Sequence, residues 1–411
     1  MSTHHEDPHA HHGLPGLDAA QVTLPRSGWG ARLPLVGGIA GLVLLAITFA
    51  GAGGQPEALF PAYLVGWFYF VTLAAGALFF VLLHHLTRAG WSVVVRRQAE
   101  AVTGALPVLA VLAVPLAFGL HSLYHWSHED AVAADPILQH KAAWLNPGSF
   151  LLRGALYLVV WSLLGWWFAR QSRRQDEMGA LVLTRRMQSV SAPGMMLFGV
   201  TFTLAAFDWI MSLEPHWFST VFGVYVFAGA AIGAFALLIV MSLLLQRGGN
   251  LSGLVTMDHF HDLGKLLLAF VVFWAYIAFS QFMLIWYGNL PEETFWFAER
   301  WNEGWRPWSI ALAVAHFVVP FFFLLLRDVK RHRAGLWLAA LWMLAVYWLD
   351  LYWLATPGHS PDGPHLHWAA LTSFLGVGCL FAAAVAWALR QRALVPVNDP
   401  RLAESLAFEN V

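Results

Sequence analysis

Ten long apolar stretches follow one another along the chain, and short polar segments separate them. The stretches lack the strict alternation of apolar and polar positions that marks a strand of a membrane barrel. About 20 apolar residues form a helix long enough to cross the hydrocarbon core of a bilayer, so the pattern predicts an all-α integral membrane protein. The predicted spans are 34–53, 59–86, 101–125, 150–170, 193–213, 217–245, 263–288, 307–326, 335–355 and 368–390.

Composition supports a membrane domain over residues 34–390. Of the 411 residues, 59% are hydrophobic and 11% are charged, whereas soluble domains carry roughly 25% charged residues. Residues 1–33 are polar and rich in histidine, which predicts a solvated tail, with a weak metal site as the alternative. Residues 391–411 are predicted to form a second, C-terminal tail.

The basic residues predict the orientation. With the N-terminus in the cytoplasm, the inner segments hold 19 of the 23 lysines and arginines. Cytoplasmic loops of membrane proteins are enriched in these residues, so both termini are expected to be cytoplasmic. The outer segments hold only Lys141, Arg153, Arg300 and Arg306.

Charge and cysteine usage narrow the partners and cofactors. The net charge of −1 does not suggest nucleic acid as a partner. Cys379 is the single cysteine, so neither covalently attached haem c nor a cysteine-ligated iron–sulfur cluster is expected on this chain.

A weak internal repeat links helices 2 and 6. Five residues of helix 2 have identical counterparts 157 positions later. The repeat predicts two similarly oriented four-helix bundles, helices 2–5 and 6–9, flanked by helices 1 and 10. Chance similarity between small-residue packing motifs is the alternative. The matched pairs are Gly66 and Gly223, Phe70 and Phe227, Ala74 and Ala231, Gly76 and Gly233, and Ala77 and Ala234.

Four ionisable residues in the predicted outer halves of the helices are candidate proton-handling groups. They are Asp208, His121, His316 and Asp350. A charge at the bilayer centre costs about 2.5–3.5 kcal/mol on insertion scales, so such residues call for an explanation. One hypothesis is that Asp208, with His121 or His316 nearby, takes protons from a substrate or passes them outward. Satisfied interior polar groups or interface residues are the alternative.

Helix 7 carries a polar stripe that we interpret as a candidate proton path. Lys265, Tyr276, Ser280 and Tyr287 fall on one face and span about 33 Å at 1.5 Å per residue. His261 and Asp262 lie at its inner mouth. Hydrogen bonding between helices without transport is the alternative.

Two sequence runs resemble a known family. They are His261-Asp262-Leu263-Gly264-Lys265 at the entry to helix 7 and Asp208-Trp209-Ile210-Met211-Ser212-Leu213-Glu214-Pro215 in helix 5. With the paired bundles, they resemble the NrfD/PsrC-like membrane subunits. The ten helices and the connection between helices 5 and 6 most resemble the ActF subunits of alternative complex III, a bacterial quinol:cytochrome c oxidoreductase. The resemblance covers about residues 34–390.

The resemblance implies a cofactor-free subunit of the bacterial inner membrane. Its implied partners are a sister NrfD-like membrane subunit, an outer iron–sulfur subunit and multihaem cytochromes c, with lipid around them. Quinol would be oxidised at the outer side, electrons would leave through clusters and haems on the partners, and protons would move through the membrane subunits. Three alternatives stay open: a non-catalytic scaffold, an independent transporter, and the anchor of another quinone-linked enzyme.

Overall fold

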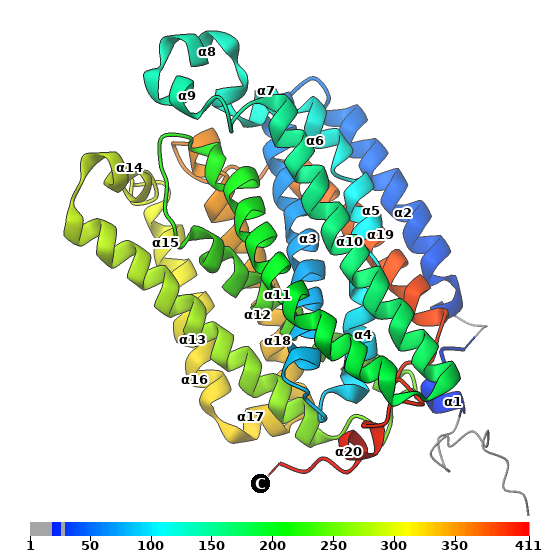
Figure 1. The fold of residues 1–411 in the computed structure, drawn as a ribbon. Coiled ribbons are helices and arrows are strands. Elements are labelled where there is room, and N and C mark those ends of the chain that lie inside the picture. Colours follow the sequence, from blue (N-terminus) through cyan, green and yellow to red (C-terminus); the bar gives the residue numbers. More distant parts are fainter. Residues whose placement is uncertain (1–18, 26–28, 411) are drawn as a thin grey trace, which may run out of the picture.

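The computed structural model describes residues 19–25 and 29–410, and within these residues it contains helices and no β-strand (Figure 1). Ten helical segments are long and apolar enough to cross a membrane. The predicted all-α fold with ten spans is therefore confirmed. The histidines of the N-terminal tail lie outside the described residues.

The ten spans run in chain order between short connecting helices. They are α2 (Trp29–Ala52), α3 (Pro56–Leu86), the series α4 (Val93–Thr103), α5 (Leu106–Val111) and α6 (Val114–Phe118), α10 (Pro147–Met178), α11 (Leu181–Trp209), α12 (Phe222–Arg247), α13 (Met257–Gly288), the series α15 (Arg306–Ala313), η3 (Val314–Val318) and α16 (Val319–Leu325), α18 (Arg333–Ala355) and α19 (Trp368–Arg390). The connecting elements are α1 (Ala19–Val22), α7 (Leu120–Leu123), η1 (His125–Ser127), α8 (Glu129–Ala134), α9 (Pro136–Lys141), η2 (Met211–Leu213), α14 (Pro291–Glu299), α17 (Arg327–Arg331), η4 (Pro357–His359) and α20 (Leu402–Leu406).

The two ends of the bundle are distinguished by these short helices. One end carries α8, α9 and α14, and the other carries α1, α17 and α20 (Figure 1). We call them the α14 end and the α20 end. By the distribution of basic residues, the α14 end is the predicted outer side.

Several helices extend further toward the α20 end than the hydropathy pattern predicted. The third span begins at Val93 instead of residue 101, and the fourth continues to Met178. Charged residues remain helical there because they form ion pairs with residues from other parts of the chain. The third span is also broken into three helices. Pro107 and Pro115 lie in the first turns of α5 and α6. Proline is tolerated there because the backbone N–H that it lacks would have no partner within the helix.

Helices α3 and α12 form the centre of the molecule. A Cβ at Gly76 of α3 would collide with the carbonyl oxygen of Ala230 in α12, so glycine allows the two backbones to approach closely. The matched glycine, Gly233 of α12, faces Leu73 of α3 across the same contact. Both members of this matched pair therefore lie at the α3–α12 contact, while the two-bundle arrangement stays a prediction.

The C-terminal segment packs against the α20 end. Leu394, Val395 and Leu402 are buried, and the backbone N–H of Leu394 donates to the carbonyl oxygen of Val22. The Ser405 hydroxyl donates to the carbonyl oxygen of Trp91 at 2.6 Å. Residues 391–410 are thus part of the folded body, although the sequence suggested a separate tail.

Candidate functional site

Asp208, near the α14 end of α11, has every carboxylate position occupied by a donor. Arg153 of α10 binds both oxygens at 2.8 and 2.9 Å, Tyr157 donates at 2.8 Å and Trp144 donates at 2.9 Å. The guanidinium group of Arg153 also lies over the Trp144 ring, 3.9 Å from its centroid. A buried carboxylate held by four donors and a paired cation is suited to fixing α10 against α11.

Neither of the histidines expected near Asp208 forms a hydrogen bond or ion pair with it in the described structure. His121 contacts Ser127 and His128, and His316 lies beside Asp350. Arg153 and Tyr157 are four residues apart, which places both on one helical face, and this spacing was the available signal for the partners of Asp208.

Asp350 is a second buried carboxyl group near the α14 end, and its partners differ from those of Asp208. Its carboxyl group is buried in α18 and accepts hydrogen bonds from the Tyr225 hydroxyl at 2.5 Å and the Trp274 indole at 3.1 Å. The nearest ring nitrogen of His316 is 3.9 Å away. Among the described residues, no lysine or arginine forms an ion pair with it. Asp350 is therefore a buried acid with neutral donors and a neighbouring base, a combination common in proton-transfer sites.

His316 lies in a π-helical turn, η3, whose cause is local. Pro320 has no N–H to donate to the carbonyl oxygen of residue 316 and its ring crowds that carbonyl group, so the helix widens over Val314–Val318. The Trp342 indole donates to the carbonyl oxygen of Ala315 at 2.8 Å, satisfying one of the disturbed carbonyl groups. The turn holds the buried His316 ring against Trp274, with centroids 3.9 Å apart.

Both ring nitrogens of His316 are buried, and neither has a hydrogen-bond partner among the residues that the structure describes. Most buried polar groups are satisfied, so an unpaired pair of imidazole nitrogens calls for an explanation. π-helical turns occur frequently at functional sites. Together these features single out His316 and Asp350 as the candidate proton-handling pair.

A large cavity adjoins this pair at the α14 end. It has a volume of about 820 Å³ and lies between α12, α13, α14, α15 and α18. Tyr225 and Trp274, the two donors to Asp350, form part of the cavity wall. Asp350 is therefore hydrogen-bonded to side chains that line the cavity. Aromatic and apolar side chains dominate the lining, and Gln281, Arg300 and Ser309 add polar atoms.

Arg300 brings a buried positive charge to the cavity wall. Its guanidinium group donates to the carbonyl oxygens of Trp296 and Leu354, both at 3.0 Å, and lies over the Trp296 ring at 3.5 Å. Its Nε atom has no hydrogen-bond partner in the described part of the chain. Burial lowers the pKa of Arg300 to about 9.

Two carboxyl groups lie near Arg300 outside the spans. Burial, followed by the charge of Glu299, raises the pKa of Glu214 to about 7. Burial also raises the pKa of Glu299 itself, whereas the charge of Arg300 lowers it. Glu214 follows η2, in the run that suggested the family resemblance. A carboxyl group that titrates near neutral pH at this end is suited to exchanging protons with water.

The predicted proton-path residues lie elsewhere. Tyr276 and Tyr287 are 66% and 84% exposed, so the α13 stripe faces outward from this chain. At its other end Lys265 forms an ion pair with Asp262 at 2.5 Å. The amide of Asn410 donates to Asp262 at 2.5 Å and contacts His261. The stripe is not brought together with Asp350 or Asp208.

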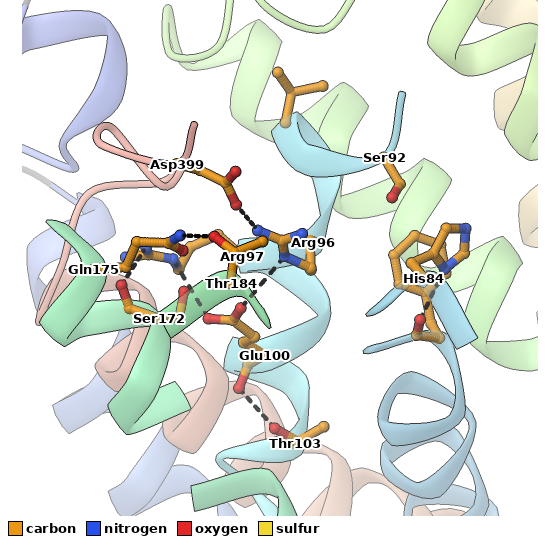
Figure 2. Close-up of polar contacts among 12 residues, drawn as sticks. His84, Ser92, Arg96, Arg97, Glu100, Thr103, Ser172, Gln175, Thr184 and Asp399 are labelled. Carbon is orange, nitrogen blue, oxygen red and sulfur yellow. Dashed lines mark hydrogen bonds and ion pairs between the residues drawn. The ribbon is translucent and has the colours of Figure 1, made fainter. Parts of the chain in front are cut away.

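A second polar cluster, which sequence reasoning missed, is buried at the α20 end (Figure 2). Arg97 binds Asp176 at 2.7 Å and lies 3.4 Å from Glu100, while Arg392 reaches Glu100 at 3.2 Å. Arg96 forms an ion pair with Asp399 of the C-terminal segment. The cluster contains three arginines and three carboxylates, so its formal charges balance.

In the part of the chain that the structure describes, no group of three or more histidine, cysteine, aspartate or glutamate side chains is arranged to hold a metal ion. The cavity beside Asp350 is the space in which an organic cofactor or substrate would fit. No protein-family model and no curated protein matches this chain.

Proposed function

We propose that this chain is a membrane subunit of a bacterial quinol:cytochrome c oxidoreductase of the alternative complex III type, and that it binds quinol in the cavity beside Asp350. The observation that supports this most is the buried Asp350–His316 pair directly behind the wall of an aromatic-lined cavity. The volume of about 820 Å³ lies within the range of small-molecule and cofactor sites.

The geometry suits the protons of quinol oxidation. A quinol becomes a quinone by losing two protons and two electrons. In the proposed reaction the Tyr225 hydroxyl accepts the first proton while its own proton passes to Asp350, to which it is hydrogen-bonded at 2.5 Å. Transfer from Asp350 to a free nitrogen of His316 then prepares Asp350 for the second proton.

The electrons must leave to partner chains, because this chain supplies no redox centre in the proposal. The proposed acceptors are the clusters of an iron–sulfur subunit and the haems of cytochrome c subunits, held with a sister NrfD-like membrane subunit. Glu214 and Glu299, at the predicted outer side, are the proposed groups that release the protons. The chain would lie in the bacterial inner membrane with both ends of the described chain on the cytoplasmic side.

The test begins with the intact assembly. The chain is captured from gently solubilised native membranes, its partners are identified, and a reduced-minus-oxidised spectrum is recorded. Haem c bands together with an iron–sulfur subunit and a second membrane subunit support the assignment. A chain that elutes alone without haem contradicts it and favours an independent transporter.

The quinol site is tested in the same assembly with Asp350→Asn, His316→Gln and Tyr225→Phe. Each change is expected to lower quinol oxidation by roughly 10²–10⁴-fold, the range for loss of a positioned acid or base. Tyr287→Phe is the matched control, because that hydroxyl lies on the exposed stripe. Normal turnover in all three variants, in a correctly assembled complex, would show that this chain is a scaffold and that quinol reacts elsewhere.

A further inference from the structure

A polar hollow at the α20 end has no part in the proposed chemistry. It has a volume of about 390 Å³ and is lined by Leu86 at the end of α3, by Arg88 in the turn that follows, and by Arg185, Gln188 and Ser189 of α11. Its lining is mostly polar, in contrast to the apolar cavity beside Asp350. By the distribution of basic residues, this end faces the cytoplasmic leaflet.

Arg88 and Arg185 bring two positive charges to this hollow. Neither Arg88 nor Arg185 forms an ion pair with a carboxylate of the described residues. Glu404, an acidic residue of the C-terminal segment, is bound by Arg401 at 2.7 Å. Arg401 also donates to the carbonyl oxygen of Arg88, and this contact holds the turn in which Arg88 has a left-handed backbone (φ 53°).

The surface next to the hollow is apolar and continues toward the middle of the membrane. On α11, Arg185 and Ser189 lie on the same face as Met196 and Val200, because the spacings of four, seven and four residues bring them into register. Met196 and Val200 are exposed. The hollow, with two arginines that have no carboxylate partner among the described residues, therefore lies at one end of an exposed apolar face of α11.

This combination matches an amphiphile with an anionic head. A phosphodiester accepts hydrogen bonds from guanidinium groups, and acyl chains pack along an exposed apolar helix face. Free phosphate would satisfy the arginines but would gain nothing from Met196 and Val200. Basic pockets at the cytoplasmic ends of membrane helices are known to bind acidic lipid head groups.

We propose that the hollow between α3 and α11 is a binding site for one anionic phospholipid of the inner leaflet, with its phosphate held by Arg88 and Arg185. Gln188 would offer its amide to the remaining head-group oxygens. The lipid would then link the end of α3, α11 and, through Arg401, the C-terminal segment.

The test uses the full chain in its native complex, stripped of loosely held lipid and titrated with phosphatidylglycerol while bound lipids are counted by native mass spectrometry. The Arg88→Gln/Arg185→Gln double variant is expected to bind the tightest lipid about 25-fold more weakly, or roughly fivefold per arginine. Arg174→Gln is the matched control, since Arg174 is an exposed arginine near the same end of α10 with no partner in the described structure. It is expected to bind like the unaltered chain.

Two further arms make the result decisive. Arg88→Lys/Arg185→Lys keeps both charges and is expected to bind within a few-fold of the unaltered chain, which separates loss of the site from loss of the fold. Phosphatidylcholine is expected to bind much more weakly, and inorganic phosphate at equal concentration is expected not to displace the lipid. Equal affinity of the double Gln variant, equal affinity for phosphatidylcholine, or displacement by phosphate would each overturn the proposal.

Discussion

Replacing Arg153 by methionine provides a quantitative test of the Asp208 site. Methionine is unbranched and uncharged, so it removes the two hydrogen bonds that Arg153 makes to the buried carboxylate while filling the space of the aliphatic part of the arginine side chain. Tyr157 and Trp144 remain as donors, but neither neutralises the charge. Removing one partner of a buried ion pair costs about 3–5 kcal/mol, and we expect the free energy of unfolding to fall by that amount.

Replacing Asp208 is expected to lower the free energy of unfolding less than replacing Arg153. Asp208 is fully buried, whereas 14% of the Arg153 side chain is exposed, so an unpaired Arg153 can turn toward water or a lipid head group and an unpaired Asp208 cannot. Asp208→Asn should therefore destabilise the chain by about 1–3 kcal/mol. Arg153→Met combined with Asp208→Leu should be more stable than Arg153→Met alone, because no charge then remains buried.

The measurement is unfolding of the purified chain in detergent micelles with increasing denaturant, followed by tryptophan fluorescence, with Arg174→Met as the control. A loss below about 1 kcal/mol in Arg153→Met, within the range of exposed ion pairs, would refute this reading of the site. So would an Asp208→Asn variant that is less stable than Arg153→Met.

Three further predictions concern other parts of the molecule. Burial raises the pKa of Glu214 from 4.5 to about 7, so the folded chain binds more protons than the unfolded chain between these values and its stability should fall as pH rises through that window; Glu214→Gln should flatten this dependence in thermal unfolding measured from pH 4 to pH 8. Gly76→Val should force α3 away from α12 and lower the free energy of unfolding by about 1–3 kcal/mol. An unchanged melting temperature would contradict the close approach of the two helices. Asp399→Asn should remove the ion pair between Arg96 and the C-terminal segment, leaving Arg96 with Glu100 of its own helix at 3.9 Å. The loosened segment should show faster hydrogen exchange over residues 391–410, whereas unchanged exchange would argue against the ion pair.

The number of spans was predictable because hydropathy alone determines which segments can cross a bilayer. The depth of Asp350 and His316 near the α14 end also followed from their positions in the apolar runs. Their pairing did not, because it depends on how α15, η3 and α16 turn against α18. In a membrane protein, lipid-facing and core-facing positions are both apolar, so periodicity does not reveal which face of a helix points inward. The polar stripe of α13 illustrates this, since its spacing was regular but it faces outward.

The buried cluster at the α20 end was missed for a related reason. Arg96, Arg97 and Glu100 precede the most apolar part of the third span, so a hydropathy window places them in a loop. They are helical and buried because Asp176, Arg392 and Asp399 come from distant parts of the chain to meet them. Long-range charge pairing of this kind leaves no local signal in a single sequence.

The ion pair between Arg96 and Asp399 also has a consequence for biosynthesis. The two residues are 303 positions apart, and Asp399 follows the tenth span whereas Arg96 enters with the third. During insertion, the Arg96 guanidinium group therefore has only one of its two carboxylate partners, Glu100 of its own helix at 3.9 Å, while seven more spans are made. The C-terminal segment supplies both Arg392 and Asp399 to the buried cluster, so a chain interrupted before residue 392 would leave the charged groups of the other two arginines and two carboxylates without their cover at the membrane surface.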